Sequence, residues 1–164
     1  MAKERGTDVE GMAEKENDIG IYRRVCRDLP AQETDVRAYS PLALAYIGDG
    51  IYELVVRSAV TARGNRSSEE LSRMVVRYVR AGAQARMAEH FLEKGLLTEE
   101  EENVYKRGRN AHTYTKAKNA TLADYKKATG FEALVGWLYL RGEDARMLTL
   151  IREGMRRVDN TETS

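Results

Sequence analysis

The sequence predicts an all-α domain, and three observations carry that prediction. From residue 41 onward, apolar residues recur at spacings of three and four, the period of a helix with one buried face. No stretch shows the sustained apolar and polar alternation that is typical of a half-buried β-strand. The 164 residues include only two prolines, Pro30 and Pro41, so few positions must interrupt a helix. This length suits one ordinary domain with an additional terminal segment.

Residues 1–36 differ in composition from the rest of the chain. They hold six basic and nine acidic residues, a net charge of −3, whereas the remainder carries +4. The first 17 residues have almost no large apolar side chains, so they cannot bury enough surface to offset the entropy of ordering. We therefore expect a charged, largely disordered tail over 1–36. Within it, apolar residues at helical spacing predict one short helix at 19–29, ended by Pro30.

The first helix of the domain is expected to begin at Pro41. Proline suits the first turn of a helix, and Ser40 before it is a favoured N-cap residue. Gly64 and the residue after it end the helix. The sequence predicts that one stripe of this helix faces inward, made of Ile47, Ile51, Leu54, Val55 and Ser58.

Capping boxes, in which a hydroxyl residue stands three positions before a glutamate, mark the next two helix starts. The first box begins at Ser67 and opens a helical run to about residue 95, with a break expected near Gly82. The second box begins at Thr98, and its helix is expected to reach about Lys106. Two well-marked helix starts follow one another here without a strand between them.

Thr121 is expected to cap a further helix, which ends at 141–142. A last helix is predicted from about residue 143 to 158. These elements together predict one helical domain over residues 38–158, followed by a short C-terminal tail at 159–164.

Two acids interrupt helices that otherwise have core composition. Asp49 lies between Gly48 and Gly50 in the apolar stretch 42–54, and a buried carboxylate without a partner is costly. Glu132 stands in a second apolar stretch, again with glycines nearby. Glycine is tolerated in a helix where another backbone or a ligand approaches closely. The alternative is that Asp49 faces solvent and the glycines serve only tight helix packing.

If the two helices are neighbours, Asp49 and Glu132 lie side by side. Paired carboxylates with water form an all-oxygen site that suits Mg²⁺, with Mn²⁺ as a possible substitute. Such a metal activates water and neutralises charge in phosphodiester hydrolysis. The spacing alone leaves a second interpretation open, in which the two acids are unrelated surface residues.

The stretch 106–127 carries a net charge of +6, and its first fifteen residues contain no acid. It mixes cations, amides and hydroxyls, a combination that binds phosphates. The alternative is a solvated, mobile loop between two helices. The residues expected to contact the phosphates of a nucleic acid are Lys106, Arg107, Arg109, Asn110, His112, Lys116, Lys118 and Asn119.

Two segments resemble the signatures of the ribonuclease III family. Residues 46–54 read YIGDGIYEL, like the family's helix in which an acid follows a glycine, and residues 131–140 read FEALVGWLYL, like its second signature. The resemblance covers about residues 38–157. It implies an all-helical endonuclease domain that acts as a homodimer on double-stranded RNA, with Asp49 and Glu132 as catalytic and metal-binding residues and Mg²⁺ as the metal.

The match is most specific to the Mini-ribonuclease III branch of that family. Ala45 and Thr129 stand where other members carry acids, and this branch shows the same reduced set. SPLALAYIGD at 40–49 and RGRNA at 107–111 also resemble the branch. Ordinary members continue into a double-stranded-RNA-binding domain, whereas this sequence ends soon after the helix that contains Met155, as expected for the Mini branch. The resemblance implies maturation of the large-subunit (23S) ribosomal RNA precursor, with ribosomal proteins as possible partners, and leaves the number of metal ions open.

Composition excludes several other classes of protein. Cys26 is the only cysteine, so there is no disulfide framework and no cysteine-based zinc site. No apolar run is long enough for a membrane span, and the charged N-terminus does not resemble a signal peptide, so we expect a soluble cytoplasmic protein. One functional alternative remains: a non-catalytic helical RNA-binding or ribosome-associated protein on the same scaffold.

Overall fold

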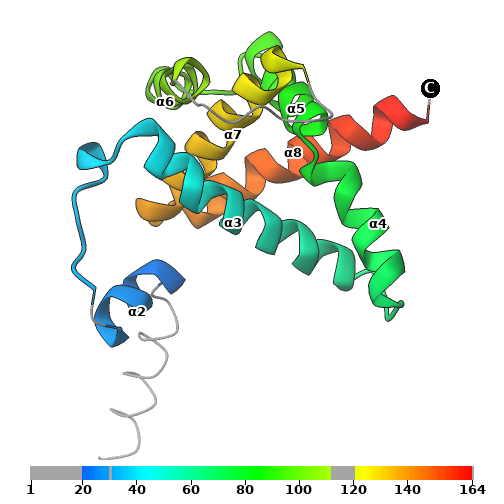
Figure 1. Cartoon of the computed structure of the whole chain (residues 1–164), viewed down its shortest axis with the longest axis horizontal. Coiled ribbons are helices and arrows are strands. Elements are labelled where there is room, and N and C mark those ends of the chain that lie inside the picture. The colour runs from blue at the N-terminus through cyan, green and yellow to red at the C-terminus, as the bar shows by residue number, and fades with distance from the viewer. Residues whose placement is uncertain (1–19, 30, 112–120, 164) are drawn as a thin grey trace, which may run out of the picture. The chain divides into compact units, whose positions relative to one another are not determined.

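The computed structural model describes residues 20–29, 31–111 and 121–163, and it divides the chain into two units, residues 1–35 and 36–164. All regular structure in the described part is helical, which confirms the predicted all-α class. The elements are α2 (Ile21–Asp28), the 3-10 turn η1 (Val36–Ala38), α3 (Pro41–Thr61), α4 (Ser68–Val79), α5 (Ala81–Glu93), α6 (Glu99–Asn110), α7 (Leu122–Leu140) and α8 (Asp144–Glu162) (Figure 1).

The first unit contains α2, which lies within the short helix predicted at 19–29. Three apolar side chains are exposed here: Ile21 and Val25 on α2, and Leu29 directly after it. Residues 1–19, which we expected to be disordered, lie outside the described residues. The disorder of the tail therefore stays a prediction.

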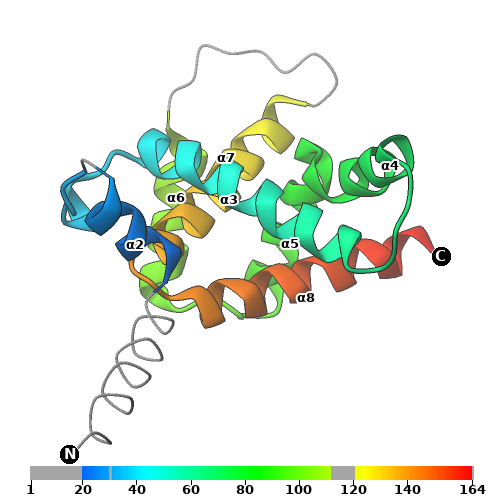
Figure 2. The ribbon, with the colours of Figure 1, turned by 90° about the horizontal axis from the view of Figure 1, so that it is seen from below.

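In the second unit, α7 is the central helix, in contact with α3, α5, α6 and α8 (Figures 1 and 2). Its segment 128–139 is buried on all sides, with Glu132 as the single residue that is not fully buried. A helix that is apolar around its whole circumference needs neighbours on every face, and the other helices provide them. The core is completed by aromatic rings, such as the edge-to-face pair of Tyr52 and Phe131.

The orientation of α3 differs from the predicted one. The buried stripe consists of Leu44, Ala45, Gly48, Tyr52, Val56 and Val60. The predicted stripe was wrong: Leu54 and Ser58 are exposed, while the other three residues are only partly covered. The physical reason is that α3 has apolar side chains on both faces, so its periodicity cannot distinguish the inner face from the outer one.

The predicted helix starts are confirmed by their hydrogen bonds. Ser40 accepts from the Ala43 N–H, and complete capping boxes form at Ser67 and Thr98. Thr121 caps α7 by accepting from the Asp124 N–H. These caps satisfy backbone donors that would otherwise lack a partner at each helix start.

The break expected near Gly82 is confirmed: it lies at Arg80, two residues earlier, where the backbone is extended. Two predicted helix ends require correction. Helix α6 continues to Asn110, four residues beyond the predicted end. Helix α8 likewise continues past residue 158 to Glu162. Both extensions consist mainly of polar residues on exposed helix ends, where no apolar periodicity marks the helix.

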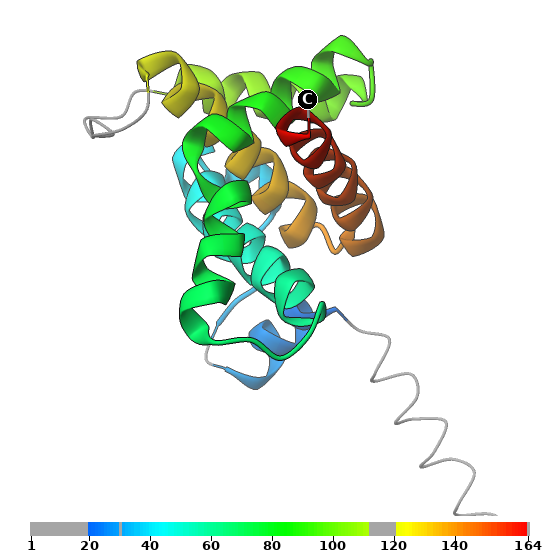
Figure 3. The ribbon, with the colours of Figure 1, turned by 90° about the vertical axis from the view of Figure 1, so that its right-hand side faces the viewer.

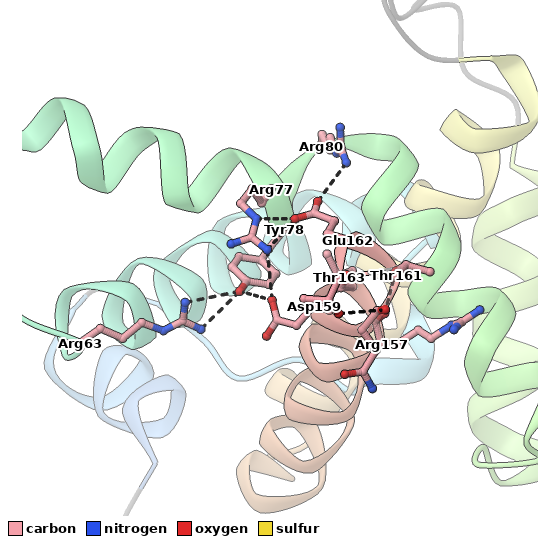
Figure 4. Close-up of polar contacts among 11 residues, drawn as sticks. Arg63, Arg77, Tyr78, Arg80, Arg157, Asp159, Thr161, Glu162 and Thr163 are labelled. Atoms are coloured by element: carbon pink, nitrogen blue, oxygen red, sulfur yellow. Dashed lines mark hydrogen bonds and ion pairs between the residues drawn. The ribbon is translucent and has the colours of Figure 1, made fainter.

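The last turn of α8 lies against the corner between α4 and α5 (Figures 3 and 4). The Tyr78 hydroxyl donates to Asp159 Oδ1 at 2.6 Å, and Arg77 Nε donates to Glu162 Oε2 at 2.6 Å. Arg80 is also paired with Glu162, at 3.4 Å. We call these five residues the α4–α8 corner. Their contacts hold the last turn of α8 against the end of α4.

Candidate active site

Two glycines allow α3 and α7 to approach each other at backbone distance. A Cβ added to Gly48 would overlap the carbonyl oxygen of Glu132, and a Cβ added to Gly136 would overlap the carbonyl oxygen of Leu44. Both positions therefore require glycine, because the facing atoms belong to backbone and cannot move aside. Gly50, by contrast, faces open space. The packing interpretation of the glycines is confirmed for Gly48.

This close approach brings Asp49 and Glu132 together, so they are not unrelated surface residues. Their carboxyl groups lie within hydrogen-bonding reach of each other. Asp49 is exposed, whereas Glu132 is mostly covered. The pair therefore lies at the boundary between the exposed surface of α3 and the interior of the domain.

The electrostatics of the pair favour protonation in the absence of a cation. Burial, followed by the charge of Asp49, raises the pKa of Glu132 to about 8, and a hydrogen bond from Gln84 opposes that shift. Burial, followed by the charge of Glu53, raises the pKa of Asp49. The two titrations are coupled, because ionising one carboxyl makes ionising the other harder.

The positions that carry acids in other members of the resembled family are filled by small buried residues. Ala45 is 6% exposed and Thr129 is 7% exposed. The Thr129 hydroxyl donates to the Tyr125 carbonyl oxygen at 3.0 Å, so it is committed to its own helix. Nearby, Glu53 accepts from Arg57 Nε at 3.0 Å, which confirms the ion pair that its spacing allowed. The centre of the site therefore holds two carboxylates.

The sequence analysis missed Gln84, a buried polar residue beside this pair. Gln84 is 2% exposed on α5, and its Nε2 donates to the Val79 carbonyl oxygen at 2.8 Å; its amide also lies close enough to the Glu132 carboxyl group to oppose the rise in the pKa of Glu132. A signal for it exists in the sequence. Gln84 occupies the first position of a buried stripe that continues through Met87, Ala88 and Phe91 at helical spacing.

The first part of the predicted RNA-binding segment is helical, contrary to our expectation of a loop. Lys106, Arg107, Arg109 and Asn110 form the last turn and a half of α6. Lys106 pairs with Glu102 at 2.8 Å, and the Arg109 guanidinium lies 5.7 Å from the centre of the Tyr105 ring. His112, Lys116, Lys118 and Asn119 lie outside the described residues.

The basic end of α6 is packed against the part of α7 that carries Glu132. A Cβ at Gly108 would lie 2.7 Å from the Ala133 Cβ and 2.9 Å from the Gly130 Cα. Gly108 and Gly130 therefore set a close contact of α6 with α7, as Gly48 does for α3. Lys106, Arg107 and Asn110 also line a shallow hollow with Pro41 at the start of α3.

Helical fold, paired acids and adjacent cations define a class of protein, and comparison with known proteins agrees. The family model described as Ribonuclease III domain matches residues 42–143. The chain therefore belongs to the ribonuclease III family. It is an endoribonuclease that acts on double-stranded RNA, as the two signatures predicted, and the non-catalytic alternative is not supported.

Individual relatives place it more closely. The chain is 44% identical over 127 residues to Mini-ribonuclease 3 of Enterococcus faecalis, covering 77% of this chain and 96% of the relative. It is 45% identical to Mini-ribonuclease 3 of Symbiobacterium thermophilum, covering 68% of this chain and 85% of the relative. The predicted resemblance to that branch is confirmed.

A solved structure and the helix composition complete the comparison. A crystal structure of a Fusobacterium nucleatum protein is similar to the chain with a TM-score of 0.64 at 30% identity, covering 73% of this chain and 93% of that one. Among the helices that the structure describes, none combines the length and apolar character that crossing a membrane requires.

Proposed function

We propose that the chain cleaves RNA duplexes at the Asp49 and Glu132 pair with Mg²⁺ as cofactor, in the maturation of the 23S ribosomal RNA precursor. The observation that carries this proposal is the meeting of two carboxyl groups from separate helices at a backbone contact. Such a pair does not stabilise the fold by attraction, because both groups carry the same charge when ionised. A bound cation would compensate the two negative charges and so explain why the two acids are placed together.

The donor set fits Mg²⁺ in its chemistry. The metal prefers oxygen ligands, and in nucleic-acid enzymes it is commonly held by one or two carboxylates, with water and substrate phosphate as further ligands. Asp49 and Glu132 would hold it. When bound, Mg²⁺ supplies activation of a water molecule and neutralisation of the charge on the phosphate. Mn²⁺, with the same ligand preferences, is the expected substitute.

The protein's own residues have three tasks in this reaction. Asp49 and Glu132 must be ionised together, which their raised pKa values oppose until a cation is present. The glycine contact keeps the two acids at one spacing. Glu53 adds negative charge near Asp49, while its ion pair with Arg57 keeps its side chain directed along α3.

The basic end of α6 is the proposed RNA surface. Arg107 is exposed, and Gly108 fixes this turn against the segment of α7 around Glu132. An RNA duplex is recognised mainly through phosphates and shape, so cations near the acids hold the backbone where cleavage occurs. His112, Lys116, Lys118 and Asn119, which lie outside the described residues, stay part of the proposal as RNA-binding residues.

The outer face of α3 supports the proposed homodimer. Three large apolar side chains on this helix are exposed: Leu42 by 40%, Tyr46 by 84% and Leu54 by 53%. A second copy of the chain would bury them. Two copies would also supply two acid pairs, one for each strand of a duplex. Replacement of Tyr46 by serine should shift the protein toward monomer in analytical ultracentrifugation, and an unchanged sedimentation coefficient would place the interface elsewhere.

We further propose that the chain acts in the cytoplasm on the 23S precursor, with ribosomal proteins as partners. The deciding experiment is a cleavage assay of the purified chain on a duplex that carries the paired ends of the precursor, with and without Mg²⁺. Cleavage of both strands only with metal is the expected result. An unrelated duplex of equal length tests selectivity, and equal rates on both duplexes would contradict the specific role in 23S maturation.

A further inference from the structure

Gln84 makes more contacts than its position in the fold requires. Its side-chain nitrogen has two N–H groups, and Nε2 donates to the Val79 carbonyl oxygen at 2.8 Å. This bond caps the end of α4, where backbone carbonyls lack helical partners. The same amide lies beside the Glu132 carboxyl group and acts on its protonation, which has no role in capping α4.

The carbonyl oxygen of Gln84 is the unusual atom. Oε1 is buried, and within the described part of the chain it has no hydrogen-bond partner. An unsatisfied buried acceptor costs free energy, so a residue that only capped α4 would be a poor choice here. The cost is reasonable where the amide also orients a functional group.

We propose that Gln84 is a positioning residue of the active site, which holds the Glu132 carboxylate beside Asp49 through its side-chain amide. The inference rests on the proposed metal-binding role of Glu132. Residues that hydrogen-bond to metal ligands fix the orientation of those ligands, and losing them typically weakens metal affinity or activity about 10- to 100-fold. Gln84 is suited to this task because α5 and the α4 cap hold its own side chain in place.

The test compares two variants at the same corner. Gln84→Met keeps the length of the side chain and removes both N–H donors. Tyr52→Phe is the matched control, because the Tyr52 hydroxyl donates to the neighbouring Tyr78 carbonyl oxygen at 2.7 Å. Each variant removes a bond to the end of α4, but only Gln84→Met also removes the amide beside Glu132.

The readout is Mn²⁺ binding without RNA, measured by electron paramagnetic resonance of free Mn²⁺, together with cleavage kinetics. We expect Gln84→Met to weaken Mn²⁺ binding by about tenfold or more and to lower kcat with unchanged KM for RNA. Tyr52→Phe should keep the parental Mn²⁺ affinity. Equal Mn²⁺ affinity in Gln84→Met and the parent would overturn the proposal.

The remaining outcomes are also decisive. If Gln84→Met does not fold, Gln84→Leu replaces it. Failure of both to fold, while Tyr52→Phe folds, would assign Gln84 to the structure of the corner and overturn the proposal. A parental chain that binds no Mn²⁺ would overturn the proposed function and, with it, this inference.

Discussion

The α4–α8 corner and the Asp49 and Glu132 pair contain similar side chains in opposite arrangements. At the corner, Asp159 accepts from the Tyr78 hydroxyl, and Glu162 is paired with Arg77 and Arg80 (Figure 4). At the pair, a carboxyl faces a carboxyl, and burial raises the pKa of both. The corner is built so that charges attract, and the pair so that they repel.

This difference indicates that the ion pairs of the corner serve stability, whereas the Asp49 and Glu132 pair serves function. Exposed ion pairs contribute little, typically about 0 to 1 kcal/mol each, but their two charges compensate each other without a bound ligand. Two carboxyls held together in a covered site reduce stability unless a proton or a cation lies between them. The packing of α3 on α7 therefore maintains an arrangement that the fold alone does not favour.

The largest expected effect comes from removing either acid. Asp49→Asn and Glu132→Gln should each abolish cleavage, because each removes the charge of a proposed metal ligand with little change in volume. Duplex binding should persist, and at pH 8 Glu132→Gln should be more stable than the parent without metal, because the repulsion between the two ionised carboxylates is gone. Cleavage assays, RNA binding and thermal denaturation in EDTA measure these effects. Substantial Mg²⁺-dependent activity in either variant would remove that residue from the proposed site.

The next effect concerns arginines with and without carboxylate partners. Joint replacement of Arg107 and Arg109 by alanine should weaken binding to all duplexes and lower the slope of affinity against salt by about two, one for each lost phosphate contact. The matched control is Arg77→Ala with Arg80→Ala, whose guanidinium groups are paired with Glu162. Binding titrations over a range of salt concentrations check this. A loss confined to the control would move RNA recognition to α4.

The pH dependence of stability sharpens the comparison further. The pKa of Glu132 is raised from 4.5 to about 8 in the folded protein, so the folded state holds its proton more tightly than the unfolded state does. Its stabilising contribution is therefore complete below pH 4.5 and is lost as the pH rises toward 8, by an amount on the order of a few kcal/mol. Denaturant unfolding in EDTA at pH 5 and pH 8 measures this loss.

Two comparisons isolate the pair from other titrating groups in that experiment. Glu132→Gln should show a smaller loss of stability over the same pH range. Added Mg²⁺ should restore stability to the parent at pH 8, because it stabilises the ionised pair, and should do little for the variant. Identical pH profiles for parent and variant would mean that Glu132 titrates normally.

The smallest effect is expected at the corner. Tyr78→Phe removes a hydroxyl that donates a hydrogen bond to Asp159 at 2.6 Å and accepts one from Arg63 at 3.3 Å. The free energy of unfolding should fall by about 1 kcal/mol, the usual contribution of one hydrogen bond. Turnover of RNA should stay at the parental value. Urea denaturation and cleavage assays test both statements, and a large loss of activity would connect the corner to the site.

Local signals made much of this architecture predictable. Hydroxyl caps at Ser40, Ser67, Thr98 and Thr121 are decided by residues within one turn, so the helix starts were predicted correctly. The acids could be found because each places a charge in an apolar stretch. That they meet is a long-range fact, and only the family resemblance supported it.

The errors had equally physical causes. The inward stripe of α3 was wrong because apolar residues on its outer face imitate a core. The end of α6 was read as a loop because a solvated helix end and a phosphate-binding loop have similar composition. Gln84 was missed because a neutral amide disturbs an apolar pattern less than a carboxylate does, although its burial is nearly complete.

Gly48 and Gly136 carry a consequence for how related chains should be judged. The distance between the two carboxyl groups depends on Gly48 and Gly136, because the absence of a Cβ at these positions lets the backbones of α3 and α7 touch. A chain could retain Asp49 and Glu132 and still separate them by a methyl group placed one residue or four residues away. Such a chain would contain both acids, but the larger distance between its two helices would keep the carboxyl groups apart, so we would not expect it to be an active enzyme.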